Sequence, residues 1–262
     1  MSTNIIVMGA GGRMGRIISE LVMADANLTL AGVVERPGHQ SALECYDCTK
    51  STDLDALLGE VKNAVVINFT APEATVDAAA IAARHGAAFV AGTTGLSAEQ
   101  KAKLAEYAAQ IPLVFAPNMS VGVNVLLKIL PQLVQLLGEQ YDLEMVELHH
   151  NRKADAPSGT ALRLAECLAE ARGWDLDETG TYCRHGIIGA RPQKEIGVQT
   201  IRGGDVVGVH TVYFMGQGER IEVTHQAHSR EMFAQGAIRA AKWLAGRPAG
   251  KLYAMTDVLA DA

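Results

Sequence analysis

Short apolar runs rich in β-branched residues recur through the first 116 residues of the chain. They are NIIVM (4–8), LTLAGVVE (28–35), AVVINF (64–69), AFVA (88–91) and PLVFA (112–116). Alanine-rich segments with helical spacing separate some of them, such as residues 72–86 and 97–110. Strands that alternate with helices and are apolar on both faces are typical of a buried parallel sheet. The pattern therefore predicts an α/β domain over residues 1–119.

The pattern changes after residue 119. The expected elements are a long helix, a strand, a second helix and two further strands, at 120–138, 142–148, 158–173, 206–216 and 219–227. A Gly216-Gln217-Gly218 turn joins the last two strands, which predicts a hairpin. Because a hairpin requires antiparallel pairing, we expect residues 120–228 to form a smaller α+β domain with a mixed sheet.

The last predicted helix, residues 230–246, has an apolar face. The residues on that face are Phe233, Ala237, Ala240, Ala241 and Leu244. A small hairpin domain leaves little apolar surface to cover such a face, so we expect it to pack on the first domain. Residues 229–262 are therefore predicted to complete the first domain.

Composition and charge exclude several classes of partner. Of the 262 residues, 48% are hydrophobic and 20% charged, which is ordinary for a globular protein. The net charge is −6 and no Lys/Arg-rich run occurs, so a nucleic acid or an anionic membrane is not an expected partner. No stretch of about 18 uncharged apolar residues is present. The first residues lack a basic segment typical of a signal peptide, so we expect a cytoplasmic location.

The four cysteines do not predict a structural role. Cys45 and Cys48 form a C-x-x-C, but Cys167 and Cys183 are not spaced as a second zinc-binding pair. A disulfide framework is not expected without an export signal. We interpret all four as reduced, incidental thiols and expect no metal site.

The sequence IIVMGAGGRMGR places glycines at 9, 11, 12 and 15, between the first strand and the first helix. The spacing differs from the usual G-x-G-x-x-G, but small residues here still let the backbone turn tightly and approach a pyrophosphate at the helix start. Glu35 ends the second strand, where an acid can accept hydrogen bonds from the adenosine ribose. Together these features predict a Rossmann-like dinucleotide-binding domain.

Two later loops belong to the same predicted site. AGTTG (91–95) and APNMS (116–120) follow the fourth and fifth strands. Ligands of open α/β sheets bind at the carboxyl ends of parallel strands. Gly92, Thr93 and Thr94 are therefore candidates for contacts near the nicotinamide.

Residues 149–161, HHNRKADAPSGTA, concentrate proton-bearing groups before a predicted helix. VELHH is expected to end a strand, which places both histidines on the following loop. Ser158 is the predicted N-cap, and Gly159 and Thr160 then carry free N–H groups that suit a carboxylate. Lys153 adds positive charge, and a histidine has a pKa near neutrality. Adjacent histidines make poor chelates, so an anion cradle beside a proton donor is favoured over a metal site.

These motifs resemble one known family. GAGGRMG, GTTG, N-x-S-x-G-V-N from Asn118 to Asn124 and HH-x-x-K-x-DAPSGTA are similar to the dihydrodipicolinate reductases of lysine and diaminopimelate synthesis. The segments IGVQTIRGGDVVGVHTVYF and SREMFAQGAIRAAKWL also look like that family, and the resemblance covers essentially the whole chain.

The resemblance implies a role for each matching residue. His149 would be the proton donor or acceptor, Lys153 a second proton donor, and His150, Ser158, Gly159 and Thr160 would contact the substrate. The implied cofactor positions are Gly9, Ala10, Gly11, Gly12, Arg13, Met14, Glu35, Arg36, Gly92, Thr93, Thr94, Ala116, Pro117, Asn118 and Met119. It also implies a homotetramer built through the second domains.

The expected activity is reduction of a cyclic imine dicarboxylate, formed from 4-hydroxy-tetrahydrodipicolinate, to tetrahydrodipicolinate. The cofactor would be NADH or NADPH, because Glu35 favours the first while Arg36 can meet the 2′-phosphate of the second. Two alternatives remain at this point. One is another nicotinamide-dependent dehydrogenase of an amino-acid pathway, and the other is a module that senses NAD(P) without catalysis.

Overall fold

The computed structural model describes residues 2–260, which divide into two compact units. Unit 1 contains residues up to 121 and from 231 onward, and unit 2 contains residues 122–230. The predicted boundaries, at 119/120 and 228/229, lie within two residues of these. No helix of residues 2–260 is long and apolar enough to cross a membrane.

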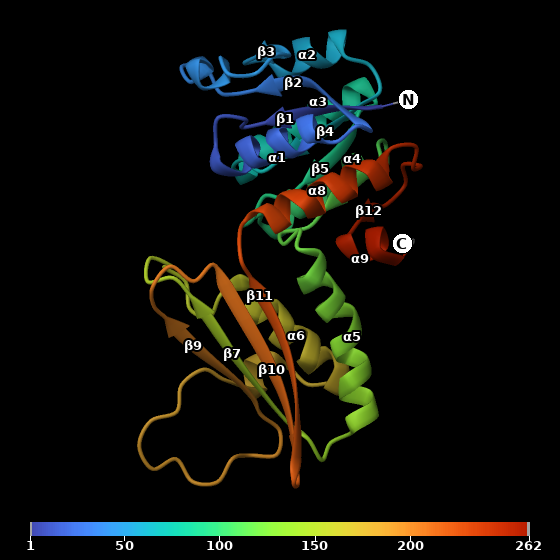
Figure 1. Ribbon diagram of the computed structural model, residues 1–262. Helices are drawn as coiled ribbons and strands as arrows, with labels where there is room; N and C mark the ends of the chain where they lie inside the picture. Colours follow the sequence, from blue (N-terminus) through green and yellow to red (C-terminus); the bar gives the residue numbers. More distant parts are fainter. Residues whose placement is uncertain (1, 261–262) are drawn as a thin grey trace. The chain divides into compact units, whose positions relative to one another are not determined.

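Unit 1 is built around a seven-stranded parallel sheet of order β12-β6-β5-β4-β1-β2-β3, shown in Figure 1. Its strands are β1 (Thr3–Met8), β2 (Leu28–Val34), β3 (Thr49–Ser51), β4 (Ala64–Asn68), β5 (Ala88–Ala91), β6 (Leu113–Phe115) and β12 (Leu252–Tyr253). Its helices are α1 (Arg13–Ala24), the 3-10 turn η1 (Gln40–Leu43), α2 (Leu54–Glu60), α3 (Pro72–His85), α4 (Ala98–Ala108), α8 (Glu231–Leu244) and α9 (Met255–Ala260). The predicted Rossmann-like parallel sheet is confirmed.

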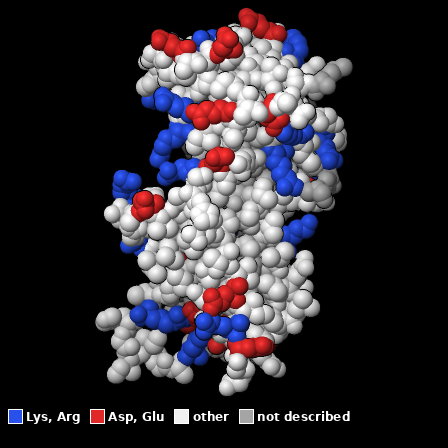
Figure 2. Space-filling view, viewed as in Figure 1, with Lys and Arg blue, Asp and Glu red and all other residues white. Residues whose placement is uncertain are grey.

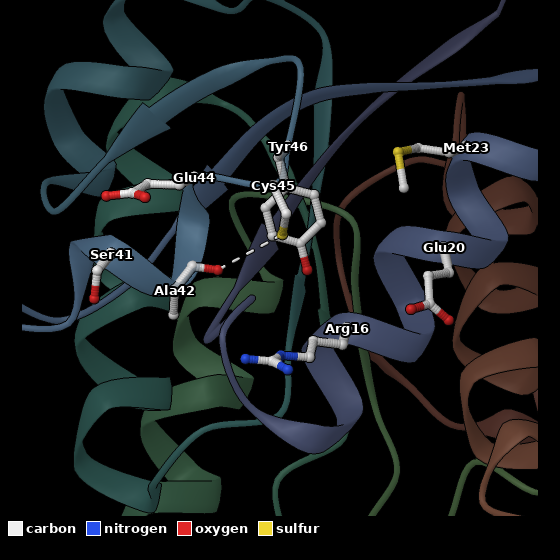
Figure 3. Close-up of a pocket in the computed structure, with 8 residues that line it drawn as sticks. All are labelled: Arg16, Glu20, Met23, Ser41, Ala42, Glu44, Cys45 and Tyr46. Atoms are coloured by element: carbon white, nitrogen blue, oxygen red, sulfur yellow. Dashed lines mark hydrogen bonds between the residues drawn. The ribbon is translucent and has the colours of Figure 1, made fainter.

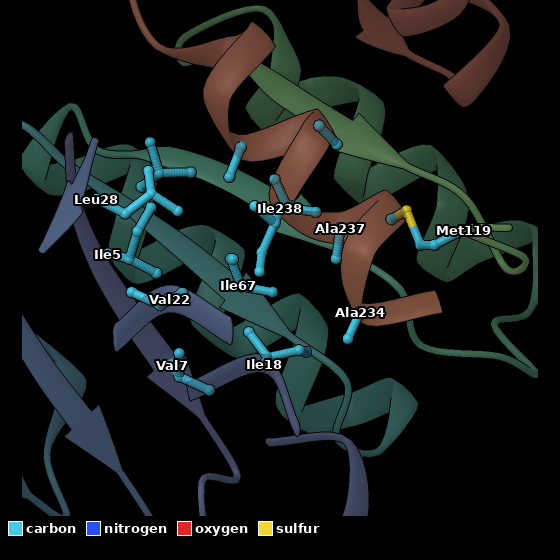
Figure 4. Packing of buried hydrophobic residues seen from close by; sticks show 14 of the residues in the cluster. Ile5, Val7, Ile18, Val22, Leu28, Ile67, Met119, Ala234, Ala237 and Ile238 are labelled. Atoms are coloured by element: carbon cyan, nitrogen blue, oxygen red, sulfur yellow. The ribbon is translucent and has the colours of Figure 1, made fainter. Parts of the chain in front are cut away.

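Apolar layers cover both faces of this sheet because alternate residues of each strand point to opposite sides. Ile5 and Val7 pack into the layer formed by α1, α8 and α9, whereas Ile6 packs into the layer formed by α2, α3 and α4. Figure 4 shows Ala234, Ala237 and Ile238 of α8 in the first layer. The last long helix thus packs on unit 1, as its apolar face predicts.

Local signals set where several helices begin and end. Ser97 and Gln100 form a reciprocal capping box at the start of α4. Pro72 occupies the first turn of α3, and Gly86 ends that helix with a φ of 65° that glycine adopts without strain.

Unit 2 contains a five-stranded mixed sheet of order β11-β10-β7-β9-β8. Its strands are β7 (Asp142–His149), β8 (Gly180–Thr181), β9 (Ile196–Arg202), β10 (Gly208–Gly216) and β11 (Glu219–Ala227). β7 pairs with β9 in parallel and with β10 antiparallel, and β10 and β11 form the predicted hairpin. The mixed sheet is therefore confirmed, although the patterning did not predict β8 or β9.

Helices cover one face of the unit 2 sheet. They are α5 (Val121–Leu137), whose first residue belongs to unit 1, α6 (Gly159–Arg172) and the short α7 (Leu176–Thr179). Leu130 of α5 and Leu164 of α6 are buried against Met145 of β7 and Val212 of β10. The opposite face, which points toward the viewer in Figure 1, carries no helix of unit 2 among the described residues.

Close packing of α8 on the loop after β6 generates a stability prediction. A Cβ added at Gly236 would lie 1.8 Å from the main-chain oxygen of Met119. Gly236→Ala is therefore expected to destabilise unit 1 by about 1–3 kcal/mol, because helix and loop must separate. Urea unfolding would be followed by the fluorescence of Trp243 in a Trp174→Phe background.

Gly59→Ala is the matched control. Gly59 also lies in a helix of unit 1, and an added Cβ there meets nothing within 4 Å. That change is expected to raise stability by about 0.5–1 kcal/mol, since glycine is the poorer helix residue. Equal effects of the two substitutions would contradict the packing argument.

Candidate active site

The glycine loop of unit 1 runs from Gly9 to Gly12, between β1 and α1. Gly9 has a φ of 65° and accepts a hydrogen bond of 2.9 Å from the N–H of Gly12. A Cβ at Gly15 would lie 2.1 Å from the Gly9 oxygen, and one at Gly11 would lie 2.6 Å from the Cβ of Ala42. The glycines therefore allow a tight turn that any side chain would obstruct.

Glu35 lies against this loop. Its Oε2 accepts a hydrogen bond from the Gly11 N–H (3.1 Å), and its Oε1 accepts one from the Arg36 N–H (3.0 Å). The carboxylate is half-buried and the adjacent Arg36 is exposed. An acceptor and a cation thus stand together at the end of β2, where the sequence predicted them.

The three predicted residues of the loop after β5 differ in burial and in their contacts. A Cβ at Gly92 would overlap the ring of Phe69 at 2.2 Å, so glycine is required there by internal packing. The hydroxyl of Thr93 is buried, 2.7 Å from that of Thr75. Thr94 is exposed. The hydroxyl of Thr93 therefore stabilises the loop from inside.

In the loop after β6, as in the loop after β5, some of the predicted residues have structural roles. The Met119 side chain is 1% exposed and belongs to the core of unit 1, and Ala116 is also buried. Oδ1 of Asn118 accepts a hydrogen bond from the N–H of Ser120 (2.9 Å), while Pro117 is exposed. Met119 can therefore meet a ligand through its backbone but not through its side chain.

The other predicted residues of the glycine loop differ in exposure. Ala10 is buried and its carbonyl accepts a hydrogen bond from the hydroxyl of Tyr46 (2.9 Å). Arg13 is exposed, and Met14 packs beside the core. Tyr46 thus supports the back of the loop, a contact that the sequence did not indicate.

A pocket of about 510 Å³ lies beside Tyr46, which is one of its lining residues (Figure 3). Its lining residues are Arg16, Glu20, Met23, Ser41, Ala42, Glu44, Cys45 and Tyr46. None of the predicted cofactor residues is among them, but the pocket adjoins the glycine loop, because Tyr46 bonds to Ala10 and Nε of Arg16 donates to the carbonyl of Gly11 (3.1 Å). Cys45 is a free thiol, as are the other three cysteines.

In unit 2, the structure corrects the position of His149. The sequence placed both histidines on the loop, but His149 is the last residue of β7 and pairs with Arg202 of β9. The ladder to β9, which the sequence pattern did not reveal, extends the strand by that residue. His150 follows the strand, and its Nδ1 has no hydrogen-bond partner among residues 2–260.

A buried carboxylate holds the imidazole of His149. Glu147 is 0% exposed, and its Oε2 lies 2.5 Å from Nδ1 of His149. Its other partners are Arg202, with Nη1 2.9 Å from Oε2 and Nη2 2.7 Å from Oε1, the N–H of Ser158 (3.0 Å) and the hydroxyl of Thr200 (3.3 Å). Burial raises the pKa of Glu147, but the hydrogen bonds from Arg202, His149 and Ser158 outweigh burial, and the pKa falls below its usual value.

The ring of His149 is largely buried but keeps a small exposed area. It is 9% exposed and lies edge-on to His210 of β10, with ring centroids 5.2 Å apart. Burial lowers the pKa of His149, and the attraction of Glu147 offsets this only in part. His210 is more deeply buried, which lowers its pKa to about 4, so it stays neutral at physiological pH.

Lys153 is near the same site and has a partner. Its Nζ lies 2.7 Å from Oδ1 and 3.0 Å from Oδ2 of Asp155, and this hydrogen bond holds the pKa of Asp155 below its usual value. Arg202 donates to the carbonyl of Asp155 (2.7 Å). Arg152 is exposed.

The start of α6 also differs from the predicted cradle. Ser158 is the N-cap, as predicted, and its Oγ accepts from the N–H of Ala161 (3.1 Å). The N–H of Ser158 is already bound by Glu147. Gly159 is exposed and Thr160 half-buried. Ser158 therefore supports the end of the loop, where a cis peptide bond joins Ala156 and Pro157, and Gly159 and Thr160 are the more exposed residues.

The sequence reasoning missed Glu147, Arg202, His210 and Gly208. Glu147 precedes His149 by two positions in a strand, which places both side chains on one face, so this signal was available. Arg202 and His210 lie on neighbouring strands and could not be placed without the pairing. No group of three or more His, Cys, Asp or Glu residues in the described part of the chain could hold a metal ion.

A parallel α/β unit with a glycine loop and a second unit with a carboxylate-held histidine together define a nicotinamide-dependent oxidoreductase. The chain belongs to the dihydrodipicolinate reductase family. The models of the N-terminus and the C-terminus of dihydrodipicolinate reductase match residues 3–119 and 122–259.

Relatives of known name agree over the full length. The chain is 68% identical to 4-hydroxy-tetrahydrodipicolinate reductase of Oleidesulfovibrio alaskensis, over 99% of this chain and 100% of the relative. It is 54% identical to the protein of the same name from an Anaeromyxobacter species, over 98% and 97% of the two chains. The chain is thus a reductase of this family, which decides against both alternatives left open by the sequence.

Solved structures share the fold. A dipicolinate-bound dihydrodipicolinate reductase from Paenisporosarcina sp. TG-14 matches with a TM-score of 0.79 and 24% identity, over 97% of this chain and 98% of that one. GenD2 from gentamicin A biosynthesis, in complex with NAD, matches with a TM-score of 0.60 and 16% identity, over 99% and 90% of the chains.

Proposed function

We propose that this chain reduces the cyclic imine formed from 4-hydroxy-tetrahydrodipicolinate to tetrahydrodipicolinate, with His149 as the group that transfers the proton. The observation that carries the proposal is the buried pair of Glu147 and His149 beside Lys153 and the start of α6. Such a pair supplies an oriented imidazole next to groups that attract an anion. The names of the relatives support the choice of substrate.

The residues of unit 1 fit a nicotinamide dinucleotide. Glycines keep side chains out of the turn before α1, where the N–H groups of a helix start suit a pyrophosphate. Glu35 offers a carboxylate for ribose hydroxyls. Arg36, Thr94 and Pro117 are exposed and Asn118 is half-buried, in the loops that follow β2, β5 and β6. When bound, the reduced nicotinamide supplies hydride to ring carbon four of the substrate.

The residues of unit 2 are proposed to hold the substrate and move its proton. A carboxylate of the substrate would accept hydrogen bonds from Gly159 and Thr160 at the start of α6 and from Lys153. Lys153 and the N–H of Gly159 both contact the carboxylate of Asp155 and must then exchange that contact. His150 would donate a further hydrogen bond. His149 would deliver a proton to the carbon next to carbon four as the enamine returns to the imine.

We also propose that the uncovered face of the unit 2 sheet joins copies of this chain in a homotetramer. Ile201 of β9 is 48% exposed and Met215 of β10 is 36% exposed, and both point to the face without helices. Figure 2 shows mostly residues other than Lys, Arg, Asp and Glu over the middle of unit 2, and a group of charged side chains at its lower end. Exposed apolar side chains on a sheet face without helices are an expected site of association, and Glu144 with its partners Arg184 and Arg191 adds polar groups to the same face.

His149→Gln is expected to lower kcat by roughly 10²–10⁴ with little change in NADH affinity, because the glutamine cannot carry the transferred proton. His185→Gln, at an exposed position of unit 2, is the control and should retain wild-type kcat. Turnover is measured as NADH oxidation with aspartate semialdehyde, pyruvate and the preceding synthase. Near-normal kcat in the His149 variant would overturn its assignment.

Cofactor use is expected to be dual, with NADH and NADPH within roughly tenfold in affinity, or about 1.4 kcal/mol. Glu35 repels the 2′-phosphate, while Arg36 binds it through charge-assisted hydrogen bonds of about 1.5–3 kcal/mol each. Arg36→Ala should weaken NADPH at least about tenfold more than NADH. Lys101→Ala, an exposed cation elsewhere in unit 1, should change neither. Thousandfold discrimination by the wild type, or equal losses in Arg36→Ala, would contradict the proposal.

The tetramer is tested by sedimentation equilibrium. The double substitution Ile201→Glu and Met215→Glu replaces two apolar side chains of the uncovered sheet face by charges, and the assembly is expected to dissociate because buried unpaired charges are costly. Met23→Glu is the control, since Met23 is 56% exposed on α1 of unit 1. A monomeric wild type, or dissociation by Met23→Glu alone, would count against this interface.

A further inference from the structure

The carboxylate of Glu147 is bound to two parts of the candidate active site at once. Its Oε2 lies 2.5 Å from Nδ1 of His149, and its Oε1 accepts a hydrogen bond of 3.0 Å from the N–H of Ser158, the N-cap of α6. One fully buried side chain thus sets the distance between the imidazole and the helix start.

Arg202 fixes the carboxylate in turn. Its Nη1 and Nη2 donate to Oε2 and Oε1 of Glu147 (2.9 and 2.7 Å), and Nη2 also donates to the carbonyl of Asp155 (2.7 Å). A bidentate contact of this kind restricts both the position and the plane of a carboxylate. Arg202 therefore holds Glu147 and the loop between His149 and Ser158 in one arrangement.

We propose that Glu147, fixed by Arg202, is a positioning residue that selects the tautomer of His149 and holds the start of α6 against it. A carboxylate only accepts hydrogen bonds, so Nδ1 of the neutral imidazole carries the proton and Nε2 is left to exchange one with the substrate. The inference rests on the proposed function of His149, and it adds a role that the reductase activity does not itself assign.

Gly208 supports this orientation of the ring. A Cβ at Gly208 would lie 3.0 Å from Nε2 of His149 and 3.4 Å from its Cδ2. The absence of a side chain therefore leaves room on the Nε2 side of the imidazole, opposite the contact with Glu147. The ring is held at one nitrogen and uncrowded at the other.

Glu147 and Arg202 have opposite effects on the pKa of His149. The groups that face the ring are Glu147 on its own strand, Arg202 on β9, His210 on β10 and Lys153 on the following loop, with His225 of β11 beyond His210. Glu147 raises the pKa of His149, whereas Arg202 and Lys153 lower it. Removing the carboxylate should therefore lower this pKa, and removing the guanidinium should raise it.

The first test is the pH dependence of kcat/KM for imine reduction. One limb of the pH profile reports the titration of His149. In Glu147→Gln this limb is expected to move to lower pH by about one pH unit or more, and in Arg202→Gln it is expected to move to higher pH. Arg202→Lys keeps the charge and should lie near the wild type. Glu144→Gln is the matched control, since Glu144 lies on the other face of β7 and contacts Arg184 and Arg191. Unchanged limbs in the Glu147 and Arg202 variants would overturn the inference.

The second test does not require turnover. Nitrogen NMR of the imidazole in the wild type should show neutral His149 protonated at Nδ1. In Glu147→Gln this preference should be lost, and circular dichroism checks that the variant is folded. Neutral His149 protonated at Nε2 would contradict the role of Glu147. A wild type that does not reduce the imine would instead remove the proposed function, while the NMR result would still decide the tautomer.

Discussion

The arrangement of unit 2 depends on a carboxylate that is fully removed from water. A buried charge of this kind is tolerated only where hydrogen-bond donors surround it, and Glu147 has donors from β7, β9 and the start of α6. The sheet order brings them together, because β7 lies between β9 and β10. His149 then stands opposite Arg202, and Glu147 opposite His210. The strand register therefore builds the site.

Unit 1 meets a different constraint, which is the close approach of backbone to backbone. Gly15 lets α1 start against the backbone of Gly9 and Ala10 in the glycine loop, and Gly236 lets α8 contact the loop that ends in Met119. These loops follow β1 and β6, and the parallel sheet places the ends of such strands at one edge. Within the turn before α1 the N–H of Gly11 donates to Glu35 and that of Gly12 to the carbonyl of Gly9, so the N–H groups that suit a phosphate are those of the first turn of α1.

Much of this could be predicted from the sequence, and the exceptions share a physical cause. The β-branched runs predicted five of the seven strands of unit 1 but not the short β3 and β12. The histidine-lysine motif pointed to the region of the site. β9 was missed, because Ile196–Arg202 contains glycine, glutamine and threonine and lacks simple alternation. Without β9 the pairing of His149 with Arg202 cannot be predicted, and His149 is therefore assigned to a loop. The contacts that depend on non-local strand order were the ones that patterning could not supply.

A second group of residues was expected to touch ligands but has structural partners. Ser158 caps α6, the hydroxyl of Thr93 contacts Thr75, and Met119 lies in the core. A motif residue near a ligand has to hold the local backbone in place before any contact can form. If ligand contacts at these three loops are made by main-chain groups, then substitutions there act through loop geometry. The side chains that remain for direct chemistry in unit 2 are then His149, His150 and Lys153, all within one short segment that Glu147 and Arg202 hold in place.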